Sequence, residues 1–214
     1  FFLVFMDRKT RSPWVTVVVP CYNAERTLRA CMESIVTQDY PNYEIIAVDD
    51  GSRDSTKTIL ESFSQVKIIS QSNQGAAAAR NGAFAQGKGE IFLLLDSDAK
   101  IFPGWIRAHV KRQAQGHRVL GGSVIPWNDT FWGLCDYYST WYEYYPQKPF
   151  QENRWQISST NVSIHRSVIQ EAGVFDTRLT RTCEDAEYCN RLTKMGIRIA
   201  FDPYILMAHH ARET

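Results

Sequence analysis

Long apolar runs are missing from this sequence of 214 residues. The longest cover only residues 1–6 and 91–95, whereas a membrane-spanning helix needs roughly 18 or more apolar residues in a row. A strong charge of one sign is also missing, because 24 Lys and Arg residues oppose 23 Asp and Glu residues. The formal charge of +1 argues against a dedicated nucleic-acid binder, which would be markedly basic.

Cysteine is scarce, and its spacing carries no metal-binding pattern. The five cysteines form no CxxC pair, so we expect no structural zinc site and predict reduced thiols in a cytosolic protein. The sequence also lacks a GxxxxGKS/T phosphate loop and a GxGxxG turn, which disfavours an ATPase and a nicotinamide-dependent dehydrogenase. With 44% apolar and 22% charged residues, the composition is that of an ordinary globular domain.

The first 125 residues alternate between expected strands and helices. Strands are expected at 15–19, 43–48, 66–70, 90–95 and 118–125. Between them we expect a helix capped by Asn23 with Glu25 in its first turn, a helix capped by Asp54, and helices at 75–86 and 103–113. This alternation predicts an α/β fold with a mostly parallel sheet covered by helices.

The pattern changes after residue 125. We expect helices at 131–145 and from Glu184 to Gly196, and strands at 161–164, 197–201 and 204–208. No linker or repeat separates this part from the first. We therefore predict one domain with an N-terminal extension at 1–14 and two halves, 15–125 and 126–214, that share one sheet.

Polar side chains directly follow three of the expected strands, at 20–23, 49–52 and 96–98. Ligands of such sheets bind beyond the carboxyl ends of the strands, so these segments predict one site. Asp96 and Asp98 could hold one Mg²⁺ or Mn²⁺, since both cations prefer oxygen ligands. The alternative is a solvated turn, because an Asp-x-Asp pattern also arises by chance.

Three polar residues in the first half suggest contacts with a nucleotide. Asp49 and Asp50 have no structural role that the sequence reveals, and a carboxylate there could accept hydrogen bonds from a nucleobase or a ribose. Close packing of an Ala-rich helix explains its alanines but not Arg80, which could face a base or a phosphate.

The second half contains three further candidates. Glu184 and Asp185 begin an expected helix, where the helix dipole alone would favour acidic residues. The functional alternative is a general base that is ionised at neutral pH. His209 follows the last expected strand and is a candidate third metal ligand.

These motifs, in this order, resemble those of the family 2 glycosyltransferases. The resemblance covers roughly residues 15 to 210 and rests on VTVVVPCYNAERTLRACMESIVTQDYPNYEIIAVDDGSRDST, NQGAAAARN, FLLLDSDA, NVSIHRSVIQEAGVFD, CEDAEYCNRLTKMGIRIAFDP and the late histidine. It implies the GT-A fold, in which a Rossmann-like, mostly parallel sheet is flanked by helices. It also implies inverting transfer of a sugar from a nucleoside-diphosphate sugar, with Mn²⁺ or Mg²⁺. UDP is the nucleoside diphosphate favoured by family frequency, and GDP and dTDP stay open.

The resemblance also implies roles for individual residues. Half 15–125 would bind the nucleotide sugar and half 126–214 the acceptor. Asp185 would be the catalytic base, with Glu184 beside the acceptor or sugar, and Asn161 would open a segment that contacts the sugar or acceptor. Asp98 would hold the metal together with His209 and Asp96. The nucleotide side of the site would comprise Pro20, Tyr22, Asn23, Glu25, Asp49 or Asp50 at the base, Arg80 beside it, and Asp96 and Ser97 toward the ribose or sugar.

Two features lie outside this resemblance. Gln151-Glu-Asn-Arg-Trp155 matches the QxxRW motif of processive synthases but precedes Glu184-Asp185 instead of following it, so we interpret it as coincidence. The aromatic stretch 127–155 could stack on an acceptor, rest on a membrane surface, pack on a missing domain or belong to the core. Glycan, lipid-linked and protein acceptors stay open, as do the oligomeric state and a location at the cytosolic face of a membrane. The alternative function is a non-catalytic nucleotide-sugar-binding domain of a larger membrane-associated protein.

Overall fold

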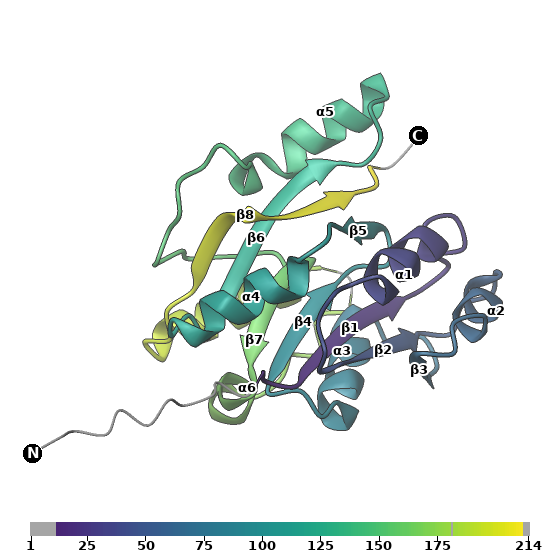
Figure 1. Ribbon diagram of the computed structural model, residues 1–214, viewed down its shortest axis with the longest axis horizontal. Helices are drawn as coiled ribbons and strands as arrows, with labels where there is room; N and C mark the ends of the chain where they lie inside the picture. The colour runs from purple at the N-terminus through teal and green to yellow at the C-terminus, as the bar shows by residue number, and fades with distance from the viewer. Residues whose placement is uncertain (1–11, 181, 212–214) are drawn as a thin grey trace, which may run out of the picture.

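One sheet of eight strands runs through the protein, whose computed structural model describes residues 12–180 and 182–211 (Figure 1). The strand order is β3-β2-β1-β4-β7-β6-β8-β5. The strands are β1 (Val15–Cys21), β2 (Tyr43–Asp49), β3 (Val66–Ser70), β4 (Ile91–Leu95), β5 (Ala99–Ile101), β6 (Val119–Pro126), β7 (Asn161–His165) and β8 (Ala200–His209). The helices are α1 (Leu28–Val36), α2 (Thr56–Glu61), α3 (Ala76–Gln86), α4 (Trp105–Ala114), α5 (Phe131–Thr140), the short 3₁₀ helix η1 (Tyr142–Tyr144), α6 (Arg166–Ala172) and α7 (Glu184–Lys194).

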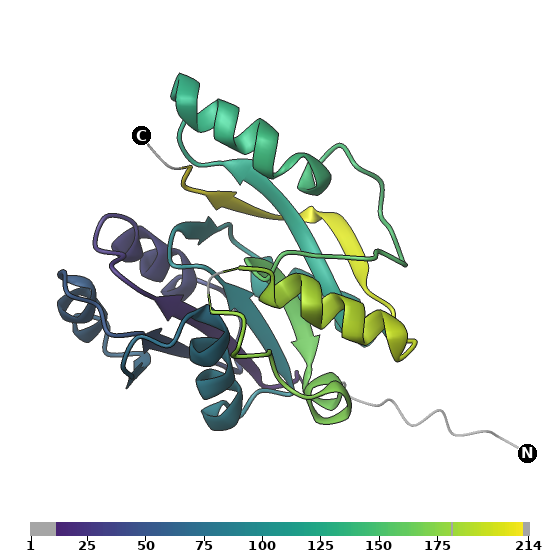
Figure 2. The same ribbon diagram turned by 180° about the vertical axis from the view of Figure 1, so that it is seen from behind.

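Strands β1 to β4 form the parallel part of the sheet, with β1 between β2 and β4. The first five residues of β1 are all buried, and four of them are valines, whose branched side chains pack well on a pleated surface. Helices α1, α4 and α5 contribute to the core on one face of the sheet. Helices α3, α6 and α7 cover the other face, which Figure 2 shows from behind.

The second half makes the sheet mixed rather than mostly parallel. Strand β7 runs antiparallel to both β4 and β6, and β5 runs antiparallel to β8, whereas β6 and β8 are parallel. Two successive antiparallel pairings turn β6 back to the direction of β4. The carboxyl ends of β1, β2, β4, β6 and β8 therefore lie along one edge of the sheet.

Most expected elements are present within one to three residues of the predicted bounds, but the last strands differ. The two strands expected at 197–201 and 204–208 are one strand, β8. Its register against β6 shifts where Gly122 pairs with Asp202 and Ser123 with Leu206. Pro203 has no N–H for the ladder, and the Asp202 carboxylate accepts the N–H of Tyr204, so the strand passes through an irregularity instead of ending.

Other differences concern short elements. Strand β5 and helix α6 were not expected, and the helix expected at 131–145 ends at Thr140 and is followed by η1. The apolar run 1–6 lies outside the described residues. Within the described part, no helix is both long and apolar enough to cross a membrane. All five cysteines are free.

Asn161, at the start of β7, ties four elements together inside the fold. Its side chain is buried and its Oδ1 accepts the indole N–H of Trp105 at 2.9 Å. Its Nδ2 donates to the backbone oxygens of Ser123 and Ile205 at 2.9 and 3.0 Å. These bonds give the Asn161 side chain a structural role in place of the sugar contact that the resemblance implied for this segment.

We expect Asn161→Ala to lower the free energy of unfolding by about 3 kcal/mol, because it leaves buried carbonyls and an indole N–H without partners. Urea unfolding followed by tryptophan fluorescence measures the change. The control is Asn153→Ala, a change in an exposed loop that should cost no more than about 0.5 kcal/mol. Equal losses for the two variants would contradict the role of Asn161.

Candidate functional site

A cleft of about 300 Å³ opens at the carboxyl ends of β1, β2 and β4, beside the starts of α3 and α7. Most of the predicted site residues line it, as the sequence analysis expected for polar side chains at these strand ends. The exceptions are Asn23, Glu25, Asp49, Asp185 and His209. The lining residues are Pro20, Cys21, Tyr22, Asp50, Ala76, Ala79, Arg80, Asp96, Ser97, Asp98 and Glu184.

The loops after β1 and β2 are hydrogen-bonded to each other, which explains why Asn23 does not cap a helix. Asn23 has a left-handed backbone, with φ at 49°, and its Oδ1 accepts the N–H of Arg53 at 2.9 Å. Glu25 accepts the N–H of Ser55, and Asp54 accepts the N–H of Glu25. Helix α1 begins only at Leu28, so the expected cap at Asn23 and the first-turn position of Glu25 are wrong. Both residues instead fix the wall of the cleft.

Asp54 comes close to the predicted role of helix cap. Helix α2 begins at Thr56, with Ser55 at the cap position, but that cap makes no side-chain hydrogen bond. The Asp54 carboxylate accepts the N–H of Thr56 instead, at 3.0 Å. Burial raises the pKa of Asp54, and hydrogen bonds from Thr56 and Glu25 lower it by more, so the carboxylate is ionised where it meets the start of the helix.

Asp49 and Asp50 both have structural partners that the sequence did not reveal. Asp49 accepts the N–H of Ser52 at 3.1 Å. Asp50 accepts three hydrogen bonds, from the side chain of Gln71 and from the N–H groups of Gln74 and Gly75, at 2.7 to 2.8 Å. Asp50 therefore holds the loop that begins α3 and also lines the cleft, whereas Asp49 does not line it.

Arg80 lies almost fully buried on α3, and its guanidinium joins two carboxylates. One terminal nitrogen lies 2.9 Å from Asp96 after β4, and the other lies 2.8 Å from Glu184 at the start of α7. The ring of Phe175 lies 5.7 Å from the guanidinium carbon. The fork of Arg80 is thus already occupied by protein carboxylates and does not point freely at a base.

Asp98 and His209 face each other at the edge of the cleft, with Oδ1 of Asp98 at 3.4 Å from Nε2 of His209. This Oδ1 is buried and accepts no hydrogen bond from the described residues. Burial raises the pKa of Asp98, but the neighbouring imidazole lowers it by more. Burial lowers the pKa of His209, but Asp98, with help from Asp96 and Asp136, raises it by more.

The predicted three-ligand metal set is not assembled. Among the residues that the structure describes, no group of three or more His, Cys, Asp and Glu side chains could hold a metal ion. Asp96 turns to Arg80, which leaves Asp98 and His209 as the facing pair. Their separation lets both atoms bind one cation, given metal–ligand distances of about 2.1 Å. Nothing in the aromatic surroundings of Asp136 in the sequence indicates that its charge acts on His209.

The first two residues of α7 point their carboxylates to different surroundings. Glu184 pairs with Arg80, whereas Asp185 makes no ion pair with any other residue that the structure describes, and its Oδ1 accepts the N–H of Ala186 at 2.7 Å. Asp185 borders a small apolar pocket behind the cleft. Burial, and then the charge of Glu184, raise the pKa of Asp185. Cys183 precedes both with a left-handed backbone, φ 73°, which no sequence signal indicated.

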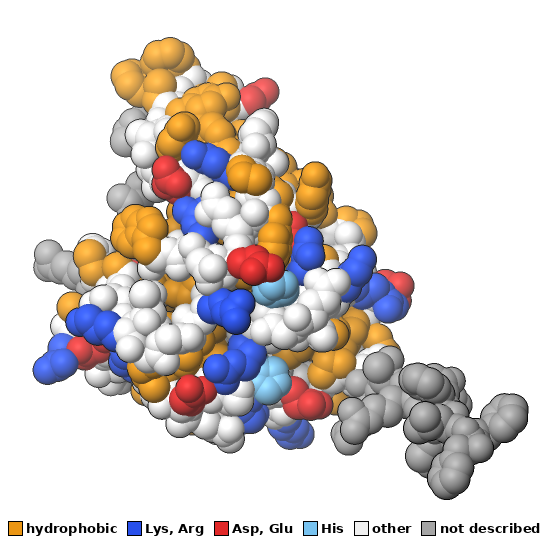
Figure 3. All heavy atoms as spheres, turned by 90° about the vertical axis from the view of Figure 1, so that its left-hand side faces the viewer, with side chains coloured by type: hydrophobic (Ala, Val, Ile, Leu, Met, Phe, Trp, Pro, Cys, Tyr) orange, Lys and Arg blue, Asp and Glu red, His pale blue; other side chains and the backbone are white. Residues whose placement is uncertain are grey.

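The aromatic stretch 127–155 has an inner and an outer face. Tyr137 is buried and donates its hydroxyl to the backbone oxygen of Val124, and the ring of Trp141 lies 4.8 Å from that of His209. Figure 3 shows hydrophobic side chains gathered over the upper part of the molecule, where α5 lies. The core interpretation is therefore right for the inner face. The outer face comprises Phe131, Trp132, Tyr138, Tyr142 and Trp155, all exposed.

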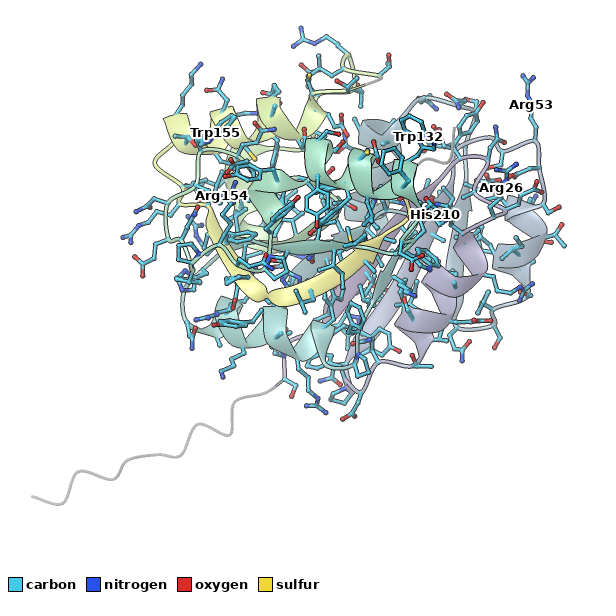
Figure 4. All side chains as sticks on the ribbon, turned by 90° about the horizontal axis from the view of Figure 1, so that it is seen from above. Arg26, Arg53, Trp132, Arg154, Trp155 and His210 are labelled. Carbon is cyan, nitrogen blue, oxygen red and sulfur yellow. The ribbon has the colours of Figure 1, made fainter. Side chains whose placement is uncertain are left out.

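The QxxRW match has a structural explanation. Arg154 is buried, donates to the backbone oxygen of Glu143 and lies over the rings of Tyr144 and Phe201 at 5.2 and 4.9 Å. Trp155 is exposed. Figure 4 shows Arg154 and Trp155 at one end of the molecule, away from His210. His210 directly follows His209 in sequence, so it marks the position of the Asp98–His209 pair. This supports the interpretation of the motif as coincidence.

Comparison with known proteins assigns the chain to a family. The family described as "Glycosyl transferase family 2" matches residues 16–173. Glycosyltransferase AglE of Haloferax volcanii is 28% identical over 211 residues, which cover 94% of this chain and 68% of AglE. Among solved structures, TarS 1–349 of S. aureus in complex with UDP has a TM-score of 0.73 at 21% identity, covering 92% of this chain and 60% of that chain. Mannosyltransferase PcManGT from Pyrobaculum calidifontis, in complex with GDP-Man and Mn²⁺, has a TM-score of 0.73 at 22% identity, covering 94% of this chain and 57% of that chain.

We expect Asp50→Asn to cost about 2 kcal/mol of stability, because an amide cannot accept all three hydrogen bonds that meet the carboxylate. Amide exchange over residues 71–79 should become faster, which hydrogen–deuterium exchange measures. Asp49→Asn is the matched control, since its remaining oxygen can still accept from Ser52, and its cost should stay below about 1 kcal/mol. If the control loosened 71–79 equally, the role of Asp50 would be refuted.

Proposed function

The chain belongs to glycosyl transferase family 2 and has the GT-A fold, and from this premise we propose that it transfers a sugar from a nucleoside-diphosphate sugar to an acceptor hydroxyl. The observation that carries the proposal is the convergence on one cleft of Asp50, Arg80, Asp96, Asp98 and Glu184. They come from four separate segments of the chain, and no need of the fold brings so many ionisable groups to one opening.

The nucleotide would occupy the cleft between the loops after β1 and β2 and the start of α3. Tyr22 is about half exposed and offers an aromatic surface for a base. Asp50 has one lone pair beyond the three hydrogen bonds it accepts, because a carboxylate has about four acceptor positions. TarS is described with UDP and PcManGT with GDP-Man. We favour UDP, and thermal unfolding with UDP, GDP and dTDP compares the three nucleotides.

A divalent cation fits the pair of Asp98 and His209. The buried Oδ1 of Asp98 has no hydrogen-bond donor among the described residues, and carboxylate oxygen with imidazole nitrogen suits Mn²⁺. Two protein ligands are enough when phosphates of the substrate supply the rest. Bound there, the metal would supply positive charge for the diphosphate leaving group. PcManGT is described with Mn²⁺, which supports this choice.

Asp185 is the better candidate than Glu184 for the general base. Glu184 is held in an ion pair with Arg80, whereas Asp185 has a raised pKa and no ion pair within the described part of the chain. A base with a raised pKa takes a hydroxyl proton more readily. In the proposed step the acceptor hydroxyl gives its proton to Asp185, its oxygen bonds to the anomeric carbon, and the bond from that carbon to the diphosphate breaks. Attack opposite the leaving group inverts the anomeric carbon.

The acceptor would approach from the side of half 126–214, where α5 begins at the same sheet edge. The outer aromatic face of α5 and η1 suits an acceptor with apolar surface, and glycan, lipid-linked and protein acceptors are all compatible with it. We propose no membrane attachment. Asn23 and Glu25 would support the nucleotide side of the site from behind the cleft.

We expect a nucleoside diphosphate together with Mn²⁺ to raise the melting temperature by several degrees, because a ligand that binds only the native state stabilises it by mass action. Thermal unfolding with UDP, GDP and dTDP, each with and without Mn²⁺, measures this. Asp98→Ala should abolish the part of the shift that needs metal. The control is Asp39→Ala, which changes an exposed carboxylate near α1.

Two outcomes would count against the donor site. If none of the three nucleotides raised the melting temperature, the evidence for the cleft as a nucleotide site would be removed. An undiminished metal-dependent shift in Asp98→Ala would move the metal away from the pair. Binding without any hydrolysis or transfer would favour the alternative of a non-catalytic nucleotide-sugar-binding domain.

We expect Asp185→Asn to lower kcat at least about 100-fold with little change in donor binding, because the amide cannot take a proton. Glu184→Gln should lower it less, since the amide oxygen can still accept from Arg80. In the wild type, kcat should rise with pH as Asp185 loses its proton. The midpoint of this rise should lie above the ordinary aspartate pKa of about 3.9, because the pKa of Asp185 is raised. Transfer assays over a pH series test this, and full activity of Asp185→Asn would exclude it as the base.

A further inference from the structure

We infer that Arg80 is a positioning residue of the proposed transfer, which holds the start of α7 against the carboxyl end of β4 and thereby fixes where the Asp185 carboxylate sits. This inference rests on the proposed function for its catalytic meaning. Arg80 spans 104 residues of sequence to reach Glu184 and 16 to reach Asp96. Arg80 thus links a carboxylate of the proposed donor side, Asp96, to one of the proposed acceptor side, Glu184, through a single side chain.

The geometry gives Arg80 a function that packing does not need. The side chain is 3% exposed, while the carboxylates of Asp96 and Glu184 are 30% and 14% exposed and line the cleft. A buried ion pair gains little stability over an apolar replacement of similar size, because both ions must leave water. The neighbouring alanines of α3 pack on the sheet without any polar group, so an apolar residue at 80 would serve packing equally well. What the arginine adds is a fixed distance between two carboxylates, that of Asp96 at the end of β4 and that of Glu184 at the start of α7.

At the start of α7, the Asp185 carboxylate accepts backbone hydrogen bonds from Ala186 and Ser159. Cys183 occupies the cap position in a left-handed conformation and makes no side-chain cap hydrogen bond. The bond from Arg80 to Glu184 therefore holds the first helical residue directly. Asp185 is the next residue, so any movement of Glu184 carries Asp185 with it. A displacement of about 1 Å at a reacting group can cost about 100-fold in rate.

The surroundings of Asp185 make its titration a readout of this contact. The groups that act on its charge are Glu184 on the same helix, Arg80 from α3, and the backbone N–H groups of Ala186 and Ser159. Asp185 in turn raises the pKa values of Tyr144 in η1 and Cys189 on α7, which lie near it. Burial and Glu184 raise the pKa of Asp185, whereas the charge of Arg80 lowers it. Removing Arg80 takes away this positive charge and leaves Glu184 uncompensated, so the pKa of Asp185 should rise further.

Two variants separate the charge of Arg80 from its fork. Arg80→Met removes both, and Arg80→Lys keeps a charge but cannot bind two carboxylates in the same fixed geometry. The control is Arg112→Met, which removes the partner of the buried Asp202 carboxylate from a second, similar pair at 2.6 Å. Arg112 lies on α4 and does not line the cleft, so its loss reports the general cost of breaking a buried ion pair.

The first measurement needs no turnover. Carboxyl ¹³C shifts of labelled aspartate, followed over pH and assigned with Asp185→Asn, should give a higher pKa for Asp185 in Arg80→Met than in wild type or Arg112→Met. Hydrogen exchange over residues 184–188 should be faster in Arg80→Met and in Arg80→Lys than in Arg112→Met. If neither the pKa nor the exchange differed from the control, the inference would be overturned. Arg80→Lys keeps the test available if Arg80→Met does not fold.

The second measurement is transfer itself. We expect Arg80→Lys to lower kcat about 10- to 100-fold while KM for the donor changes less than about threefold, with the acid limb of the pH profile close to that of wild type. Arg80→Met should lower kcat further and move that limb to higher pH. A wild type that binds but never transfers would refute the proposed function, and the titration and exchange results would still decide whether Arg80 holds Asp185. An unchanged kcat in Arg80→Lys would overturn the positioning role.

Discussion

The ion pairs of Arg80 are the interaction on which the site depends, because two acidic side chains from distant segments could not otherwise share one opening. Without the guanidinium, Asp96 and Glu184 would repel each other across a cleft that is shielded from water on one side. With it, the end of β4 and the start of α7 become one rigid wall. Phe175 in half 126–214 lies against the guanidinium, so the Arg80 side chain has contacts in both halves of the chain.

A second set of restraints fixes the opposite wall through backbone groups. Asp50 accepts the N–H of Gly75, and the backbone of Thr180, which leads toward α7, lies against the same glycine. A Cβ on Gly75 would approach the Thr180 oxygen to 2.7 Å, and its φ of 90° disfavours other residues. The start of α3 can thus lie close to half 126–214 only because residue 75 has no side chain. Elements of the two halves meet at Gly75 through backbone and at Arg80 through charge.

The sequence predicted the parts of this arrangement that depend on local pattern. The β-branched run of β1 and the apolar run of β4 each stop at polar residues, and both strands end at the cleft as expected. Predictions failed where a partner distant in sequence decides the outcome. Asn23 is a typical helix-capping residue, but its side-chain oxygen accepts the N–H of Arg53 instead. Asp49 and Asp50 are indistinguishable in sequence, and only the position of the 71–75 loop gives Asp50 three donors. Likewise, no periodicity could separate the inner from the outer face of α5.

Two pairs of acidic residues at this site are close in sequence but differ in their surroundings, and the difference explains how one fold can serve opposite chemical needs. Asp96 and Asp98 flank a single serine, yet one faces a guanidinium and the other an imidazole. Glu184 and Asp185 are adjacent, yet one is paired with Arg80 and the other is half-buried with a raised pKa. A binding carboxylate must stay ionised, whereas a base must be able to take up a proton, and neighbouring environments separate the two roles. In each pair Arg80 engages one member, while the other meets different surroundings, the imidazole of His209 for Asp98 and a small apolar pocket for Asp185.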